Sequence, residues 1–182
     1  MWPTRAKGIS AAPRHLPPID GELHAMEERV IRPFVRGRDE QAWIELYNAY
    51  YGHYYGRELE PAPEDDVAWW ENTPWWRDTR IFMAELAGEP VGFVVASMSV
   101  NLPEPAFKRG FINSIGVLKP FRRMGVGTTI MSAAVSWLAS KGVEVVELGV
   151  DNENPTDAPA FYGRLGFRAA FKHLAFSKEL RA

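Results

Sequence analysis

The segment from Arg122 to Thr128 contains the residue types that bind an anion. Its sequence, Arg-Arg-Met-Gly-Val-Gly-Thr, places Arg122 and Arg123 before two closely spaced glycines, Gly125 and Gly127. A tight loop that enters a helix directs several backbone N–H groups and the positive end of the helix dipole at one point. Glycines let a phosphate approach that backbone, and arginines add charged donors. The segment therefore predicts a pyrophosphate-binding loop.

The residues after Gly127 distinguish three kinds of phosphate loop. A Walker loop requires a lysine after its last glycine, but Thr128 and Thr129 stand there. A dinucleotide fingerprint requires a third glycine, and Ile130 occupies that position. The remaining pattern, Arg-x-x-Gly-x-Gly starting at Arg122, resembles the coenzyme A pyrophosphate loop of the GNAT superfamily of N-acetyltransferases. The alternative is a glycine-rich turn before a core helix.

A second motif occupies residues 150–167. It contains Asn-Pro-Thr-x-Ala starting at Asn154, followed by Tyr-x-x-x-Gly-Phe from Tyr162 to Phe167. This motif is similar to the other GNAT signature, in which a short helix carries a tyrosine and Gly-Phe opens a last strand. The order and separation of the two motifs also match, and the resemblance covers roughly Arg29 to Lys178.

The resemblance implies an α+β fold with α/β/α layers, acetyl-CoA as cosubstrate and no metal. Its central mixed, mostly antiparallel sheet would have six to seven strands flanked by about four helices. In this superfamily the strand before the loop splays from its neighbour, and its exposed backbone pairs with the pantetheine arm. Asn154 would hold the arm, unless it is only a turn or helix-capping residue. The other cofactor-binding residues would be Ile115, Gly116, Val117, Arg122, Arg123, Met124, Gly125, Val126, Gly127 and Thr128.

Tyr162 is the candidate catalytic residue. Attack of an amine on a thioester expels a thiolate, and a phenol beside the sulfur can protonate it. The alternative is a core tyrosine on an amphipathic helix. Some superfamily members carry a glutamate base at the position of Phe111, and neither Phe111 nor nearby Asn113 can take a proton. The base is therefore open between water and four residues, Glu85, Glu104, His53 and Asp151.

The implied activity is transfer of acetyl from acetyl-CoA to a primary amine of a small molecule, peptide or protein. Without cysteine the chain cannot form an acetyl-cysteine intermediate, which favours direct transfer in a ternary complex. The alternatives are a regulatory module that binds acetyl-CoA without turnover, and an acyltransferase with a longer acyl donor or a hydroxyl acceptor. The stretch from Arg32 to Trp43 is similar to repeats of mycothiol synthase, which does not identify the acceptor.

Aromatic and acidic residues crowd the segment between Tyr47 and Trp76. The aromatic set contains Tyr47, Tyr50, Tyr51, Tyr54, Tyr55, Trp69, Trp70, Trp75 and Trp76, and the acidic set contains Glu58, Glu60, Glu64, Asp65 and Asp66. Aromatic rings beside carboxylates suit a cationic amine. An aromatic core flank with a solvated acidic face explains the pattern equally well.

Hydrophobic periodicity predicts the elements that position these residues. Expected strands are residues 28–35, 79–86, 91–98, 111–118, 143–150 and 167–177. Expected helices are residues 40–51, with Asp39 as N-cap, then 64–71, 128–140 and 158–165. The second and third strands form a hairpin around Gly88, and Gly142 marks the end of the long helix.

Composition excludes several classes of function. The 182 residues fit one domain, residues 27–182, preceded by a flexible proline-containing arm, residues 1–26. A net charge of -2 argues against nucleic-acid partners, and no apolar run suits a membrane span. The four histidines show no ligand spacing. A cytoplasmic enzyme is expected, and a homodimer would be ordinary for the resembled superfamily.

Overall fold

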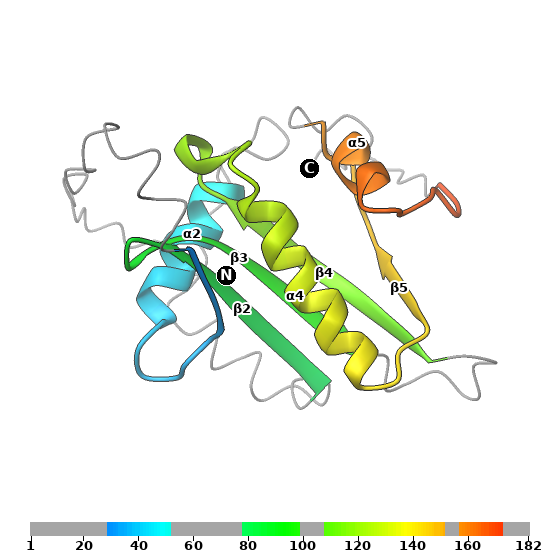
Figure 1. The fold of residues 1–182 in the computed structure, drawn as a ribbon, viewed down its shortest axis with the longest axis horizontal. Coiled ribbons are helices and arrows are strands. Elements are labelled where there is room, and N and C mark those ends of the chain that lie inside the picture. Colours follow the sequence, from blue (N-terminus) through cyan, green and yellow to red (C-terminus); the bar gives the residue numbers. More distant parts are fainter. Residues whose placement is uncertain (1–28, 52–77, 99–107, 152–156, 173–182) are drawn as a thin grey trace, which may run out of the picture.

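A five-stranded sheet forms the centre of the molecule in the computed structural model, which describes residues 29–51, 78–98, 108–151 and 157–172. The strands are β1 (Arg29–Pro33), β2 (Thr79–Leu86), β3 (Glu89–Met98), β4 (Arg109–Val117) and β5 (Val145–Leu148), which lie side by side in that order. The first three pairings are antiparallel, and β4 pairs with β5 in parallel. The expected mixed, mostly antiparallel sheet is therefore confirmed (Figure 1).

Helices cover both faces of this sheet. They are α2 (Glu40–Tyr51), α4 (Val126–Ser140) and α5 (Ala158–Arg164), and a short 3₁₀ turn, η4 (Lys119–Phe121), precedes α4. Alternate residues of a strand point to opposite faces. In β3, Phe93 and Val95 pack with α2, whereas Val94 and Ala96 pack with α4 and α5. The result is the expected α/β/α arrangement.

The expected boundaries of the hairpin and the long helix are close to the observed ones. Between β2 and β3, Ala87 and Gly88 both have positive φ, 50° and 81°, as a tight two-residue hairpin turn requires. Gly142 follows α4 with φ of 78°, which confirms the predicted helix end. These local features agree with the sequence because turn and cap chemistry acts over a few residues.

The expectation of six to seven strands and about four helices is wrong for the described residues, which form five strands and three α-helices. The segment from Phe167 to Lys172 was expected to begin a last strand, yet it is not part of the sheet and is mostly exposed. A strand exists only where a neighbouring backbone pairs with it. The last strand of the sheet, β5, is itself only four residues long. The expected helix at residues 64–71 and the arm at residues 1–26 lie outside the described residues.

Strands β4 and β5 separate after a short paired stretch. Their pairing runs from Arg109↔Val145 to Ile112↔Leu148, where β5 ends. From Ser114 to Val117, β4 pairs only with β3 among the described strands. Figure 1 shows β5 leading away from β4 toward α5. The divergence expected from the resemblance is thus present.

No helix in the described ranges has the length and apolar character needed to cross a membrane.

Candidate active site

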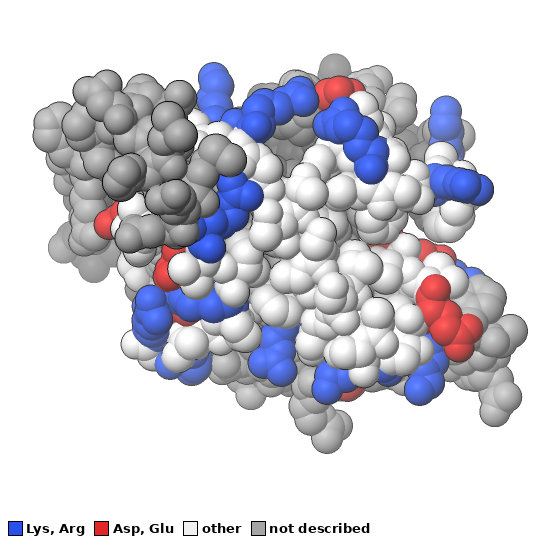
Figure 2. Space-filling view, viewed as in Figure 1, with Lys and Arg blue, Asp and Glu red and all other residues white. Residues whose placement is uncertain are grey.

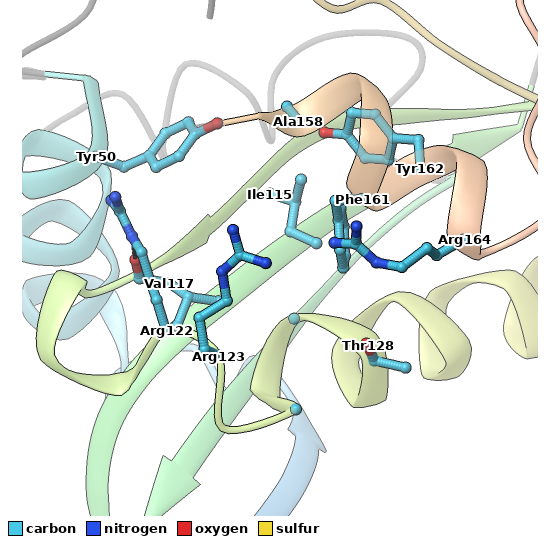
Figure 3. Close-up of a pocket in the computed structure, with 12 residues that line it drawn as sticks. Tyr50, Ile115, Val117, Arg122, Arg123, Thr128, Ala158, Phe161, Tyr162 and Arg164 are labelled. Atoms are coloured by element: carbon cyan, nitrogen blue, oxygen red, sulfur yellow. Dashed lines mark hydrogen bonds between the residues drawn. The ribbon is translucent and has the colours of Figure 1, made fainter. Parts of the chain in front are cut away.

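A pocket of about 340 Å³ lies on the side of β4 from which β5 diverges (Figure 3). Its walls come from α2, the end of β4, the glycine loop with the first turn of α4, and α5. The lining residues are Tyr50, Ile115, Val117, Arg122, Arg123, Gly125, Gly127, Thr128, Ala158, Phe161, Tyr162 and Arg164. Residues from distant parts of the chain therefore meet where the sheet opens.

The glycine loop leads directly into the N-terminus of α4. Gly125 precedes the helix with φ of 80°, and the first helical hydrogen bond runs from the Thr129 N–H to the Gly125 carbonyl at 3.0 Å. The N–H groups of the first turn precede this bond and have no intrahelical acceptor. Since Gly125, Gly127 and Thr128 line the pocket, the positive end of the helix faces it. This arrangement suits an anion.

Three arginines border this part of the pocket. The Arg122 Nε donates to the Val117 carbonyl at 2.9 Å, which anchors this side chain to the end of β4. Arg123 adopts a left-handed backbone with φ of 66°, and Arg164 comes from α5. Figure 2 shows basic side chains over the glycine loop and over α5. The described lining contains no carboxylate and no histidine, so its formal charge is positive although the chain as a whole is acidic.

Arg29 of β1 supports the loop from behind, a contact that sequence reasoning missed. Its Nη1 donates to the Thr129 hydroxyl at 3.1 Å, and its Nη2 donates to the Met124 carbonyl. A Cβ at Gly125 would lie 3.3 Å from this Nη1, so both φ and space favour glycine there. About one hundred residues separate Arg29 from the loop, and no sequence pattern spans that distance.

Eight of the predicted site residues line the pocket, namely Ile115, Val117, Arg122, Arg123, Gly125, Gly127, Thr128 and Tyr162. Three others adjoin it without lining it. Val126 is buried at the start of α4, the Met124 carbonyl accepts from Arg29, and Gly116 faces Phe93 on the α2 side. Asn154 lies outside the described residues. Ala158, Phe161 and Arg164 were not predicted, although helical spacing from Tyr162 could have found Ala158, four residues earlier.

Tyr162 combines a core position with access to the pocket. The residue is 8% exposed, and its ring packs against those of Phe161 and Phe167, with centroids 5.3 and 6.1 Å away. Its hydroxyl points into the pocket, toward the side where Tyr50 lies (Figure 3). Packing fixes the ring, as in a core tyrosine, while the phenol faces the cavity. The role of Tyr162 as a catalytic acid stays a prediction.

The structure describes two of the four candidate bases, Glu85 and Asp151, and neither lines the pocket. Glu85 is buried and accepts hydrogen bonds from Arg32 and Arg38, away from the pocket lining. Asn113 accepts a 2.8 Å hydrogen bond from the Ser97 hydroxyl. Asp151 is half-buried and does not line the pocket. Glu104 and His53 lie outside the described residues. No described candidate base is therefore placed at the pocket.

Glu85 belongs to a buried ion cluster that joins β1, β2 and α2. The Arg32 guanidinium donates to both oxygens of Asp39, at 2.5 and 2.8 Å, and also to Glu85. Asp39 precedes α2 as expected, but its carboxylate accepts from the Val35 N–H at 2.7 Å and from Arg32 rather than capping the helix. The N-cap prediction is right in position and wrong in role, because the arginine competes for the carboxylate.

This cluster predicts how stability depends on pH. The hydrogen bonds from Arg32 hold the pKa of the Asp39 carboxyl below its ordinary value of 3.8. A depressed pKa in the folded state gives stability that is present above the unfolded pKa and lost as pH falls through the folded one. We expect the free energy of unfolding to decline below about pH 4. Urea titrations at several pH values should show a weaker decline in Asp39→Ala, and equal declines would contradict the assignment.

Gly127 provides a direct test of the loop. A Cβ there would lie 3.4 Å from the Phe161 ring, an ordinary contact, so Gly127→Ala should fold normally. We expect it to weaken anion binding by about tenfold, because a methyl group displaces a phosphate from the amides. Gly163→Ala, in α5 with open space around its Cβ, is the matched control and should bind like the wild type. Calorimetric titration with acetyl-CoA measures the affinity of both variants. Equal affinities would exclude close approach of a phosphate at Gly127.

Together these features define an α/β/α domain whose pocket has a positive loop at one end and an open strand edge along its side. Within the described ranges, no three acidic or histidine side chains are grouped to hold a metal ion. The chain belongs to the acetyltransferase (GNAT) family, which it matches over residues 41–167. The family assignment made from the two motifs is confirmed.

The chain is similar to two mycothiol acetyltransferases. It is 31% identical over 167 residues to the mycothiol acetyltransferase of Streptomyces griseus subsp. griseus, covering 91% of this chain and 52% of the relative. It is 32% identical over 143 residues to that of Thermobispora bispora, covering 75% of this chain and 45% of the relative. The chain thus spans about half the length of the curated relatives it matches.

A solved structure shares the fold. The aminoglycoside acetyltransferase AAC(6')-Iy, in complex with the bisubstrate analog CoA-S-monomethyl-acetylneamine, superposes with a TM-score of 0.65 at 22% identity. The match covers 84% of this chain and 99% of that one. At this level of identity the comparison establishes the fold.

Proposed function

We propose that the protein is an N-acetyltransferase that transfers acetyl from acetyl-CoA to a primary amine of a small molecule or peptide, by direct transfer in a ternary complex. The observation that carries the proposal is the junction of the positive loop with the unpaired part of β4 in one pocket. A phosphate-bearing cosubstrate with an amide-containing arm needs both features. The relatives named acetyltransferases support the same activity.

The residues present fit coenzyme A. Arg122, Arg123 and the first turn of α4 would hold its pyrophosphate. The stretch from Ile115 to Val117 lies where β5 has diverged, so its backbone could pair with the pantetheine amides as an added strand would. Gly127 leaves the amides of the helix accessible because it has no side chain. Bound there, acetyl-CoA supplies an activated acyl group as a thioester.

Tyr162 would act as general acid in the transfer. A carbon–nitrogen bond forms to the acetyl carbon while the carbon–sulfur bond breaks, and the Tyr162 hydroxyl donates a proton to the departing sulfur. Solvent then returns a proton to the phenolate. The packing of the ring against Phe161 and Phe167 keeps the hydroxyl aimed into the pocket. Since the whole chain lacks cysteine, no thiol can carry the acetyl group between donor and acceptor.

The amine must lose a proton, and the described lining offers no carboxylate or imidazole for it. We infer that water accepts this proton, or that a residue outside the described ranges does so. A pocket lined by arginines also disfavours a protonated amine close to the reacting centre. The acceptor would therefore bind more readily in its neutral form as pH rises.

The proposal for the class of acceptor rests more on the relatives than on the geometry of the pocket. Mycothiol acetyltransferases and an aminoglycoside acetyltransferase are named for small polar molecules. The bisubstrate analog bound by AAC(6')-Iy joins donor and acceptor parts in one molecule, which supports direct transfer on this fold. A screen for the acceptor should begin with small polar amines and include peptides.

Calorimetric titration of the full chain with acetyl-CoA, with ATP and NAD as controls, tests the cosubstrate. We expect binding of acetyl-CoA alone. Arg122→Ala should weaken this binding by about tenfold, since one charge-assisted hydrogen bond contributes roughly 1.5–3 kcal/mol. Lys141→Ala, which removes an exposed cation at the far end of α4, should bind normally. Absence of acetyl-CoA binding by the wild type would refute the proposal.

The lack of a described base at the pocket favours a second candidate, a module that binds acetyl-CoA without turnover. Thiol release separates the two possibilities. Release of free coenzyme A that depends on an added amine establishes the transferase. Tight binding without release across the whole amine panel would favour the binding module.

A further inference from the structure

The two lining tyrosines lie across the pocket from the start of α4. Figure 3 shows Arg123 and Thr128 on one side of the cavity and Tyr50, Ala158 and Tyr162 on the other, which is called the tyrosine end below. A ligand whose phosphates lie at the N-terminus of α4 and which extends across the cavity places its opposite end between the two tyrosines. Figure 3 shows their side chains on opposite walls, with the hydroxyls directed toward one another across the cavity.

Tyr50 has little room to move away from the cavity. A Cβ at Gly116 of β4 would lie only 3.2 and 3.1 Å from the Cβ and Cγ of Tyr50, so this side chain rests directly on the strand backbone. Its helix is fixed by Trp43, which is fully buried on the same face of the sheet, and by Leu46. The Asp39 cluster secures the other end of α2. These contacts hold Tyr50 against β4 at the wall of the pocket.

We propose that Tyr50 determines which acyl group the enzyme accepts, by closing the tyrosine end of the pocket against chains longer than acetyl. This inference rests on the proposed function. An acetyl group would lie among Ile115, Ala158 and the two phenol rings. Two more methylene groups would have to displace the Tyr50 ring, whose side chain already rests against the β4 backbone at Gly116. Hydrophobic pockets of this kind discriminate a single methylene by about tenfold or more.

Binding measurements on the full chain test this role without requiring the acceptor. Acetyl-CoA and butyryl-CoA are titrated calorimetrically into the wild type, Tyr50→Ala and Tyr50→Phe. We expect the wild type to bind butyryl-CoA at least about tenfold more weakly than acetyl-CoA. Tyr50→Ala should reduce this difference to about threefold or less, whereas Tyr50→Phe, which keeps the ring, should retain it. Tyr50→Leu provides the same comparison if the alanine variant does not fold.

Tyr47→Phe is the matched control on the same helix. Tyr47 packs against Trp43 and Phe93 and does not line the pocket, so its variant should show the selectivity of the wild type. The proposal is overturned if folded Tyr50→Ala keeps the preference for acetyl-CoA, or if the wild type binds both acyl-CoAs equally. Failure of the wild type to bind any acyl-CoA is a different result, which refutes the proposed function and this inference together.

Discussion

Tyr162→Phe is expected to lower the turnover number for amine-dependent thiol release by about a hundredfold or more, because general acid catalysis contributes roughly 10²–10⁴-fold. Affinity for acetyl-CoA should change by less than about threefold. The substitution removes only the hydroxyl, and the ring that packs against Phe161 and Phe167 remains. Steady-state kinetics with the best amine of the screen, together with calorimetry, measures the two quantities.

A lower turnover number with nearly unchanged affinity for acetyl-CoA would identify Tyr162 as a general acid. Loss of affinity with unchanged turnover would mean that Tyr162 serves only to shape the pocket. Phe161→Leu is a suitable companion, because Phe161 lines the same pocket from the same helix but has no proton to donate. It should affect binding more than turnover. A thiol leaving group with a lower pKa should also partly restore the activity of Tyr162→Phe, since it needs less protonation.

Asp39→Ala is expected to lower the free energy of unfolding by about 3–5 kcal/mol, as found when one partner of a buried ion pair is removed. Asp39 is 2% exposed, and its loss leaves the Arg32 guanidinium with fewer acceptors and the Val35 N–H without its carboxylate. Urea denaturation followed by circular dichroism measures the change. The same variant should also loosen α2, which carries Tyr50.

Glu45→Ala is the control for this effect. Glu45 lies on the exposed side of α2 and accepts a 2.9 Å hydrogen bond from Gln41 one turn earlier. Such an exposed pair contributes about 0.5 kcal/mol or less, so this variant should unfold like the wild type. If Asp39→Ala loses no more stability than Glu45→Ala, solvent replaces the carboxylate and the cluster is not what fixes α2 on the sheet.

The elements that could be predicted are those with strong local signals. The hairpin turn at Ala87 and Gly88 and the long helix ending before Gly142 follow from turn chemistry and helical periodicity. The strand expected after Phe167 could not be judged in this way, because a strand depends on a neighbouring backbone that local sequence does not reveal. Asp39 shows the same limit on a smaller scale. Its position before the helix was predictable, but its use by Arg32 depends on tertiary contact.

The same distinction applies to the residues of the candidate site. The residues from Arg122 to Thr128 are contiguous, so their pattern alone predicts an anion site. Tyr50, Arg164 and Arg29 reach the loop or the pocket from three separate elements. Each of these side chains is ordinary in its own segment, and only the fold gives it a role.

The contact between Arg29 and the glycine loop affects how the domain should be delimited. The family match begins at residue 41, which is after β1, so it leaves out both Arg29 and Arg32. A fragment cut at that boundary would keep every motif residue of the loop and lose the side chain that holds the Met124 carbonyl and the Thr129 hydroxyl. Expression of this domain for crystallisation or ligand screening therefore needs β1, which precedes the segment that matches the family. Failure of a shorter clone to bind a ligand would not show that the full domain lacks the site.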